Sequence, residues 1–231
     1  MFFMLKTPLT NLFPIENGVE LAVKQANDAG GIDGKQIEVV VEDDKGDASE
    51  AATVANMLVQ NDNIVGVVGH FNSSCTLAGA TIYNDAGIVQ ISPGSSAEAV
   101  SEAGDYTFRT ITTDAVQGRY LAEWCVNDLG YHNIAVLYEN DDYGLGLADV
   151  IQRETEALGA TVVAREAYEV NQTDFSTVLT KVAASDADVM IIGGLYNETA
   201  LIAKQMGDNG LEGMQIMGVD AIYSDALIEL G

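Results

Sequence analysis

The chain has 231 residues, enough for two domains of ordinary size, and its composition of 48% hydrophobic and 19% charged residues is typical of a folded globular protein. Its formal net charge is −25, from 35 acidic against 10 basic residues, which argues against nucleic acid or an anionic membrane surface as a partner because both need a basic surface. The acidity fits either a solvated coat that maintains solubility or a high-salt environment in which ions screen the self-repulsion.

The apolar start of the chain, residues 1–5, is typical of a first strand that leads into residues 7–10. It is too short for a signal peptide and has no small-residue cleavage site. No apolar run elsewhere reaches the length needed to cross a bilayer. We therefore expect neither a signal sequence nor a membrane span within this sequence.

Strand and helix patterns alternate through the first half of the chain. Residues 16–29 have helical spacing, and the glycine-rich segment 30–34 breaks that helix. Asp47 and Glu50 have the spacing of a capping box, which opens a helix to about residue 60. The other patterns of this half predict strands over 37–42, 64–69, 88–91 and 106–110 and helices over 76–85 and 97–103.

The same alternation restarts after Thr113. The predicted helices of the second half run from 114 to about 129, over 143–158, 175–184 and 198–209, and from 224 onward. The predicted strands cover 134–139, 161–168, 189–193 and 215–218.

Short apolar strands that alternate with amphipathic helices predict an α/β fold with parallel sheets covered on both faces. The two successive runs predict two doubly wound lobes, an N-terminal lobe over 1–112 and a second lobe over 113–231. Ligands of such sheets bind beyond the carboxyl ends of the strands. We therefore expect a ligand site in a cleft between the lobes.

Two serine-rich segments follow predicted strands of the first lobe, at residues 69–76 and 91–96. A serine at a strand-to-helix junction can cap the helix through its side chain, and the free backbone N–H groups there lie at the positive end of the helix dipole. Two such ends from one sheet form a seat for a carboxylate or a phosphate. The competing interpretation is that Ser73 and Ser96 only cap helices.

The sequence predicts no catalytic residue, no metal site and no cofactor. His70 and His132 are the only two histidines, and no nucleophile elbow is present. His70 ends a predicted strand, where a structural hydrogen bond is the usual role. The glycines of 144–149 lack the third glycine of a dinucleotide fingerprint. Cys75 and Cys125 form either a disulfide or, as the pattern favours, two unrelated buried thiols.

Seven short motifs lie in order along the chain, at residues 17–23, 30–34, 69–76, 91–93, 108–110, 142–144 and 174–176. In this order they resemble the leucine/isoleucine/valine-binding proteins, the substrate-binding components of ABC importers with the type I periplasmic-binding fold. The resemblance begins at about Thr7 and implies two α/β lobes, joined by hinge strands, that close over an amino acid. In that family the chain returns to the first lobe after the second, so the resemblance implies an incomplete first lobe and a sequence truncated at its C-terminus.

The resemblance also implies roles for individual residues. Ser73 and Ser96 match side chains that bind the ligand α-carboxylate. Asp220 and the backbone carbonyl of Gly94 match the groups that receive the α-ammonium, and Tyr143 matches an aromatic that packs over the ligand from the second lobe. The full set expected to contact the ligand is Phe71, Asn72, Ser73, Gly94, Ser95, Ser96, Tyr143, Tyr196 and Asp220.

The chain departs from the family pattern in the pocket for the ligand side chain. Asp220 stands where the branched-chain binders have a glutamate, which is longer by one methylene. Leu195 replaces a tyrosine, for which the adjacent Tyr196 can substitute. The loop after Thr10 is shorter than is usual in the family.

These observations lead to the hypothesis of a non-enzymatic, extracytoplasmic solute-binding protein. It would capture an amino acid or a similar small amphipathic ligand, close about a hinge near residues 111–113, and deliver the ligand to an ABC permease in the membrane. We expect a monomer in the periplasm or at the cell surface, where a lipid anchor on a longer precursor is one option. Two alternatives remain open: a ligand-sensing domain of a receptor or regulator with the same fold, and an enzyme on a doubly wound fold.

Overall fold

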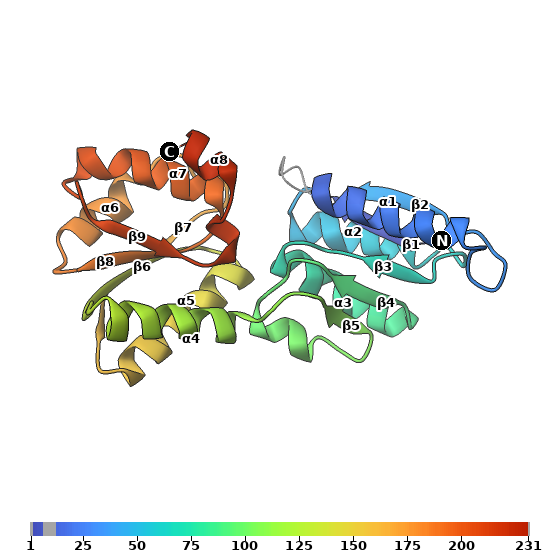
Figure 1. The fold of residues 1–231 in the computed structure, drawn as a ribbon, viewed down its shortest axis with the longest axis horizontal. Helices are drawn as coiled ribbons and strands as arrows, with labels where there is room; N and C mark the ends of the chain where they lie inside the picture. The colour runs from blue at the N-terminus through green and yellow to red at the C-terminus, as the bar shows by residue number, and fades with distance from the viewer. Residues whose placement is uncertain (1, 7–12, 231) are drawn as a thin grey trace. The chain divides into compact units, whose positions relative to one another are not determined.

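The computed structural model describes residues 2–6 and 13–230, with side chains from residue 15 onward (Figure 1). The chain divides into two compact units, Met1–Thr112 and Thr113–Gly231, and each is described by itself. The alternating pattern of the sequence correctly predicts α/β architecture with parallel sheets. Within the described residues, no helix combines the length and the apolar character that a membrane crossing requires.

The first unit contains a five-stranded parallel sheet in the order β2-β1-β3-β4-β5. Its strands are β1 (Phe2–Lys6), β2 (Val39–Asp43), β3 (Gly66–Val68), β4 (Val89–Ser92) and β5 (Thr107–Arg109). Its helices are α1 (Phe13–Asp28), α2 (Ala48–Leu58), α3 (Ser73–Ala86) and the short 3-10 helix η1 (Glu98–Glu102).

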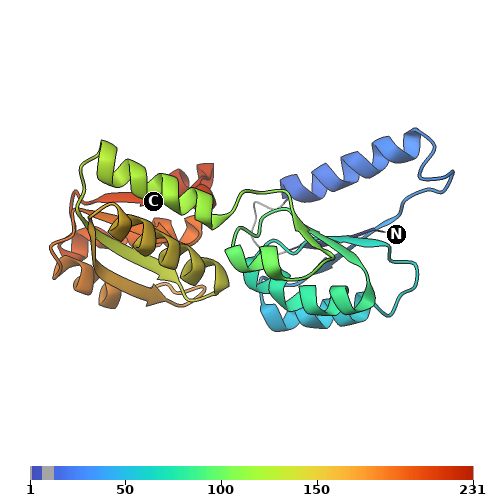
Figure 2. The same cartoon turned by 90° about the horizontal axis from the view of Figure 1, so that it is seen from below.

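The two faces of this sheet are covered unequally. Figure 2 shows α2 and α3 together on one face and α1 on the other. The α2–α3 face has a closed core of Val54, Ala55, Leu58, Ile64, Val67 and Tyr83. On the α1 side, none of residues 15–28 is fully buried, and Phe108 of β5 is 52% exposed. The core of the first unit is therefore one-sided, although a parallel sheet is usually covered on both faces.

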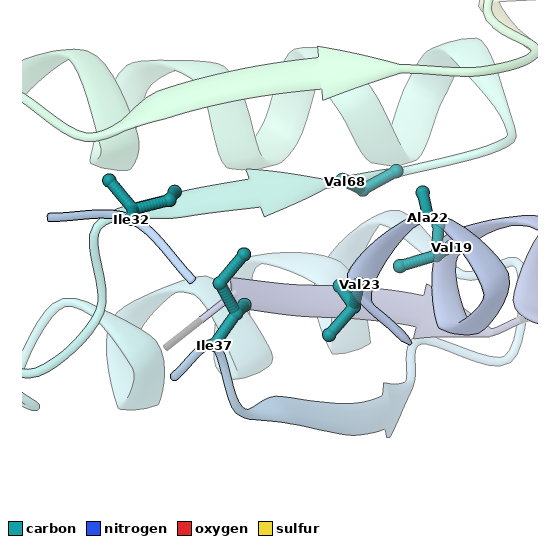
Figure 3. A pocket seen from close by; sticks show the side chains of 6 residues that line it. All are labelled: Val19, Ala22, Val23, Ile32, Ile37 and Val68. Atoms are coloured by element: carbon teal, nitrogen blue, oxygen red, sulfur yellow. The ribbon is translucent and has the colours of Figure 1, made fainter. Parts of the chain in front are cut away.

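A cavity of about 250 Å³ lies between α1 and the sheet (Figure 3). Among the residues whose side chains the structure describes, those that line it are all aliphatic: Val19, Ala22, Val23, Ile32, Ile37 and Val68. The three lining residues of α1 lie on one face of that helix, and none of them is fully buried.

The second unit contains a four-stranded parallel sheet in the order β7-β6-β8-β9. Its strands are β6 (Asn133–Glu139), β7 (Thr161–Tyr168), β8 (Val189–Gly193) and β9 (Gln215–Gly218). Its helical segments are α4 (Asp114–Glu123), the π-helical turn η2 (Trp124–Asp128), α5 (Asp142–Ala157), α6 (Ser176–Ala183), α7 (Tyr196–Met206), η3 (Gly207–Asn209), η4 (Asp220–Ile222) and α8 (Asp225–Leu230).

The second sheet is buried on both faces. Phe175, Leu179 and Ile202 belong to a core cluster on the side of α6 and α7, and Leu147 and Ile151 belong to a second cluster on the side of α5. All five residues of β8, between these clusters, are buried. This strand is the continuous apolar run that a doubly covered parallel strand requires.

Local chemistry explains where several elements begin. Asp47 caps α2, because its Oδ1 accepts hydrogen bonds from the backbone N–H groups of Ser49 and Glu50. The Asp47 side of the predicted capping box is therefore confirmed. The Glu50 carboxylate instead pairs with Lys45. Cys75 and Cys125 are both buried and form no disulfide, as the thiol interpretation predicts.

Candidate functional site

Two loops of the first unit lie at the carboxyl ends of adjacent parallel strands. The first loop, residues 69–76, follows β3 and includes the first turn of α3; the second, residues 92–96, begins at the last residue of β4, which pairs directly with β3. This edge of the sheet is where doubly wound folds bind ligands. Six of the residues predicted to contact a ligand, namely Phe71, Asn72, Ser73, Gly94, Ser95 and Ser96, lie in these two loops.

Hydroxyl groups tie the two loops together. Ser92 Oγ donates to the backbone carbonyl of His70 at 2.6 Å and accepts from the N–H groups of Gly94 at 3.3 Å and Ser95 at 2.9 Å. Ser95 Oγ in turn donates to the carbonyl of Phe71 at 2.8 Å. The two loops are therefore one hydrogen-bonded unit, and neither can move without breaking bonds to the other.

The interpretation of Ser73 and Ser96 as helix caps is wrong. Helix α3 begins at Ser73 itself, and its N-cap is Asn72, which makes no side-chain cap hydrogen bond. Ser73 Oγ instead accepts from the N–H of Ala97 at 3.3 Å, which links it to the second loop. The helix predicted after Ser96 is the 3-10 turn η1, and its N-cap is Ala97. This turn is too short to have a substantial helix dipole.

Phe71, Asn72 and Gly94 shape the surface above these bonds. A Cβ on Gly94 would lie 2.4 Å from two carbon atoms of the Phe71 ring, so glycine is needed for the ring to lie this close to the loop. The buried Oδ1 atom of Asn72 has no hydrogen-bond partner in the described part of the chain. A buried acceptor without a partner is costly, so this atom is suited to a ligand N–H group.

Arg109 is a residue whose role the sequence reasoning missed. It ends β5, and its guanidinium donates to the carbonyls of Ser95 at 3.0 Å and Ala97 at 2.8 Å. Its position directly beside the predicted site, in a motif of the family resemblance, was the available signal. Arg109 fixes the backbone on both sides of Ser96.

The remaining three predicted residues lie in the second unit, again beyond carboxyl ends of strands. Tyr143 follows β6 in the first turn of α5, Tyr196 follows β8 as the first residue of α7, and Asp220 follows β9 in η4. Because the strand order is β6-β8-β9, these three loops are neighbours at one edge of the second sheet. Asp141 caps α5 by accepting from the N–H of Gly144 at 2.7 Å.

Tyr143 is nearly enclosed, with 7% of its surface exposed, and its hydroxyl has no hydrogen-bond partner among the described residues. Burial raises the pKa of Tyr143 well above its ordinary value, and the carboxylates of Asp114 and Asp220 add to the shift. The hydroxyl therefore stays protonated and can act as a donor. Asp220 is exposed, and its N–H donates to Gln117 Oε1 at 3.3 Å; Tyr196 is half-buried.

A pair of buried carboxyl groups lies next to this edge, and sequence reasoning missed it. Glu139 is 2% exposed and Glu198 is 3% exposed. Burial, followed by the charges of Asp141 and Glu198, raises the pKa of Glu139 to about 8. Asn197 Nδ2 donates to Glu198 Oε1 at 2.9 Å. The sequence gives little indication of this burial, because an acidic residue at the end of an apolar strand, such as Glu139, is usually exposed in a loop.

Among the described residues, no group of three or more His, Cys, Asp or Glu side chains could hold a metal ion. His70 makes the structural hydrogen bond that its strand-end position predicts, with Nδ1 2.6 Å from Asp44 Oδ2.

Comparison with known proteins gives a consistent result. The family described as periplasmic binding protein matches residues 10–231. An amino acid binding protein of Pseudomonas aeruginosa is 37% identical over 211 residues, which are 91% of this chain and 56% of that protein. A Leu/Ile/Val-binding protein homolog 1 of Brucella suis is 36% identical over 217 residues, 94% of this chain and 58% of that protein. The chain thus spans less than three fifths of the length of these relatives.

Solved structures are similar over the whole chain. The branched-chain amino acid transporter substrate binding protein LivJ of Streptococcus pneumoniae, in complex with isoleucine, has a TM-score of 0.85 at 31% identity and covers 99% of this chain and 66% of its own. The leucine binding protein LivK of Thermotoga maritima has a TM-score of 0.90 at 25% identity and covers 100% of this chain and 65% of its own.

Proposed function

Since the chain belongs to the periplasmic binding protein family, we propose that it is the substrate-binding component of an ABC importer and that it captures an amino acid, with branched-chain amino acids as the leading candidates. The observation that supports this most directly is positional. All nine residues predicted to contact the ligand lie beyond the carboxyl ends of β3, β4, β6, β8 or β9. Two of the similar solved structures are complexes with isoleucine or leucine.

The groups present suit a zwitterion. In the first unit, Ser73, Ser96 and the backbone N–H groups around them would hold the α-carboxylate, because N–H and O–H donors are what a carboxylate needs. In the second unit, the Asp220 carboxylate would receive the α-ammonium, assisted by the carbonyl of Gly94. Charge-assisted hydrogen bonds of this kind contribute roughly 1.5–3 kcal/mol each.

The side chain of the ligand would meet Phe71, Asn72, Tyr143 and Tyr196. This set is mixed, because three aromatic rings are accompanied by two polar atoms without a hydrogen-bond partner among the described residues, Asn72 Oδ1 and the Tyr143 hydroxyl. An apolar ligand side chain would pack on the rings, whereas the two polar atoms would bond to the ligand backbone or to water.

We further propose that the two compact units are the two lobes of this family and that a ligand contacts both of them. Closure would then occur about a hinge near residues 111–113. A protein with this role works outside the cytoplasm, makes no chemical change to its ligand, and transfers it as a monomer to a permease in the membrane.

Isothermal titration of the purified protein with a panel of amino acids tests the proposal. We expect saturable binding of one ligand per chain for leucine, isoleucine or valine, and no heat from glutamate, whose second carboxylate has no basic partner among the nine residues. Absence of binding by every amino acid in the panel would refute the proposed ligand class.

A further inference from the structure

A buried triad lies directly behind the first ligand loop. Asp44 follows β2, His70 follows β3 and Tyr83 lies on α3, and each is 0% exposed. His70 Nδ1 is 2.6 Å from Asp44 Oδ2, and the Tyr83 hydroxyl is 3.4 Å from His70 Nε2. None of the three belongs to the predicted ligand set.

The partners assign the proton of the imidazole ring. With a carboxylate at Asp44, Nδ1–H is the donor of this hydrogen bond, and in the neutral ring Nε2 then accepts from the Tyr83 hydroxyl. Burial and the Asp44 carboxylate raise the pKa of Tyr83, which keeps that donor protonated. The second oxygen of Asp44 accepts from the N–H of Gly46 at 2.9 Å, so the buried carboxylate is satisfied on both sides.

The His70 ring lies close to helix α3 at Gly79. A Cβ on Gly79 would lie 2.6 Å from His70 Nε2 and 2.8 Å from a carbon atom of the Tyr83 ring. Glycine at this point of α3 therefore lets the imidazole lie against the helix backbone. The side chain of His70 therefore has a partner at each nitrogen atom and packs close to α3 at Gly79.

The backbone of the same residue holds the ligand loops. The His70 carbonyl accepts from Ser92 Oγ at 2.6 Å and from Thr76 Oγ1 at 3.1 Å. Once Ser92 gives its single proton to His70, its lone pairs face the N–H groups of Gly94 and Ser95. A chain of bonds thus runs from Asp44 through His70 and Ser92 to the loop of residues 92–96.

We propose that His70, clamped by Asp44 and Tyr83, is the positioning residue of the ligand site: it sets the direction of its own carbonyl and thereby the geometry of the loop that receives the ligand carboxylate. The role rests on the proposed function, because it concerns the site that function uses. It goes beyond a satisfied core histidine, because it predicts changes at Gly94 and Ser95 when the ring loses a partner.

Three variants test the role at increasing severity: Tyr83→Phe deletes one hydroxyl, Asp44→Asn removes one charge at constant shape, and His70→Gln removes the ring. The matched control is Tyr168→Phe, which deletes another buried tyrosine hydroxyl in the second unit. Native-state hydrogen exchange of the Gly94 and Ser95 amides is measured in each, together with the affinity for isoleucine.

We expect exchange at Gly94 and Ser95 to accelerate by about tenfold in Asp44→Asn and His70→Gln, and less in Tyr83→Phe, with unchanged exchange there in the control. Isoleucine affinity should fall in the same order. Unchanged exchange at both amides in the folded Tyr83→Phe and Asp44→Asn proteins overturns the inference, even if affinity changes. Accelerated exchange in a protein whose parent binds no amino acid supports the positioning role and refutes the proposed function.

Discussion

Asp220 is the residue whose charge the proposed function needs most. It is exposed in the second unit, so the desolvation cost of its carboxylate is small in the absence of a ligand. We expect Asp220→Asn to weaken amino acid binding by about 1–3 kcal/mol, roughly 5- to 150-fold in Kd, because the ammonium loses its charged acceptor. Titration calorimetry measures the change, and Asp225→Asn, which removes an exposed charge on α8, is the control. Equal affinity in both variants would remove Asp220 from the site.

Glu139 makes a prediction about stability and pH. Its pKa in the folded protein is about 8, against a reference value of 4.5. Between pH 4.5 and pH 8 the carboxyl group is therefore protonated in the folded state and ionised in the unfolded state. The stabilisation is therefore complete below about pH 4.5 and is lost as the pH rises through 8. We expect Glu139→Gln, which stays neutral, to be more stable than the parent by about 1–3 kcal/mol at pH 8.5 and close to it at pH 5.

Urea unfolding at the two pH values checks this expectation, and Glu212→Gln, at an exposed position, serves as the control. A parent and a Glu139→Gln variant with parallel stability profiles over this range would show that Glu139 ionises as an ordinary surface acid.

At the scale of single residues, the sequence predicts which side chains follow the ends of the strands but not which residues hold them there. The serines of the two loops and the acid after β9 are visible because strand ends are visible. The partners Asp44, Ser92 and Arg109 come from other strands, and no local pattern connects them to His70 or Ser96. The capping interpretation of Ser73 failed by one position, because α3 begins at Ser73 and Asn72 occupies its N-cap.

The contact between Phe71 and Gly94 is a test of loop geometry. A methyl group at position 94 would meet the ring at 2.4 Å, so the ring or the loop has to move. We expect Gly94→Ala to lower the free energy of unfolding by about 1–3 kcal/mol, as overpacking usually does, and to weaken binding because the ring leaves its place. Chemical denaturation and titration calorimetry measure the two effects.

The control is Gly146→Ala in α5, where a Cβ would meet nothing within 4 Å. Replacing an unhindered glycine within a helix stabilises by about 0.5–1 kcal/mol, so the two substitutions should have opposite signs. If the Gly94→Ala protein is as stable as the parent and binds as tightly, the loop or the ring can move to admit the methyl group without a measurable loss of free energy.

Elements with strong periodicity are predicted to the residue, and those that depend on neighbours are not. The strands Thr161–Tyr168, Val189–Gly193 and Gln215–Gly218 match their predicted bounds. The strand predicted over 64–69 is observed only over Gly66–Val68, because two residues at its start and Gly69 at its end lie outside the ladder. The helix predicted to reach residue 129 ends in a π-helical turn from Trp124.

The net charge of −25 acts on the whole molecule. Unfolding separates like charges, so at low ionic strength self-repulsion lowers the stability of the compact state. We expect the midpoint of thermal unfolding to rise by several degrees as NaCl increases from about 10 mM to 1 M, where the Debye length falls from about 30 Å to 3 Å. Differential scanning calorimetry follows the midpoint, and sucrose at equal osmolality controls for solute effects. A midpoint independent of NaCl would show that repulsion between the acidic side chains does not lower the stability of the folded state.

The one-sided packing of the first sheet has a consequence for the order of events on heating. Helix α1 buries none of its described side chains fully and lies over an apolar hollow, whereas the face with α2 and α3 is tightly filled. Such a helix detaches at small cost, and its departure leaves α3, which carries Tyr83 and lies on the other face of the sheet (Figure 2), in place. Part of the helical ellipticity, that of α1, should therefore be lost at a lower temperature than the ligand affinity, because the loops proposed to bind the ligand carboxylate remain folded after α1 has detached.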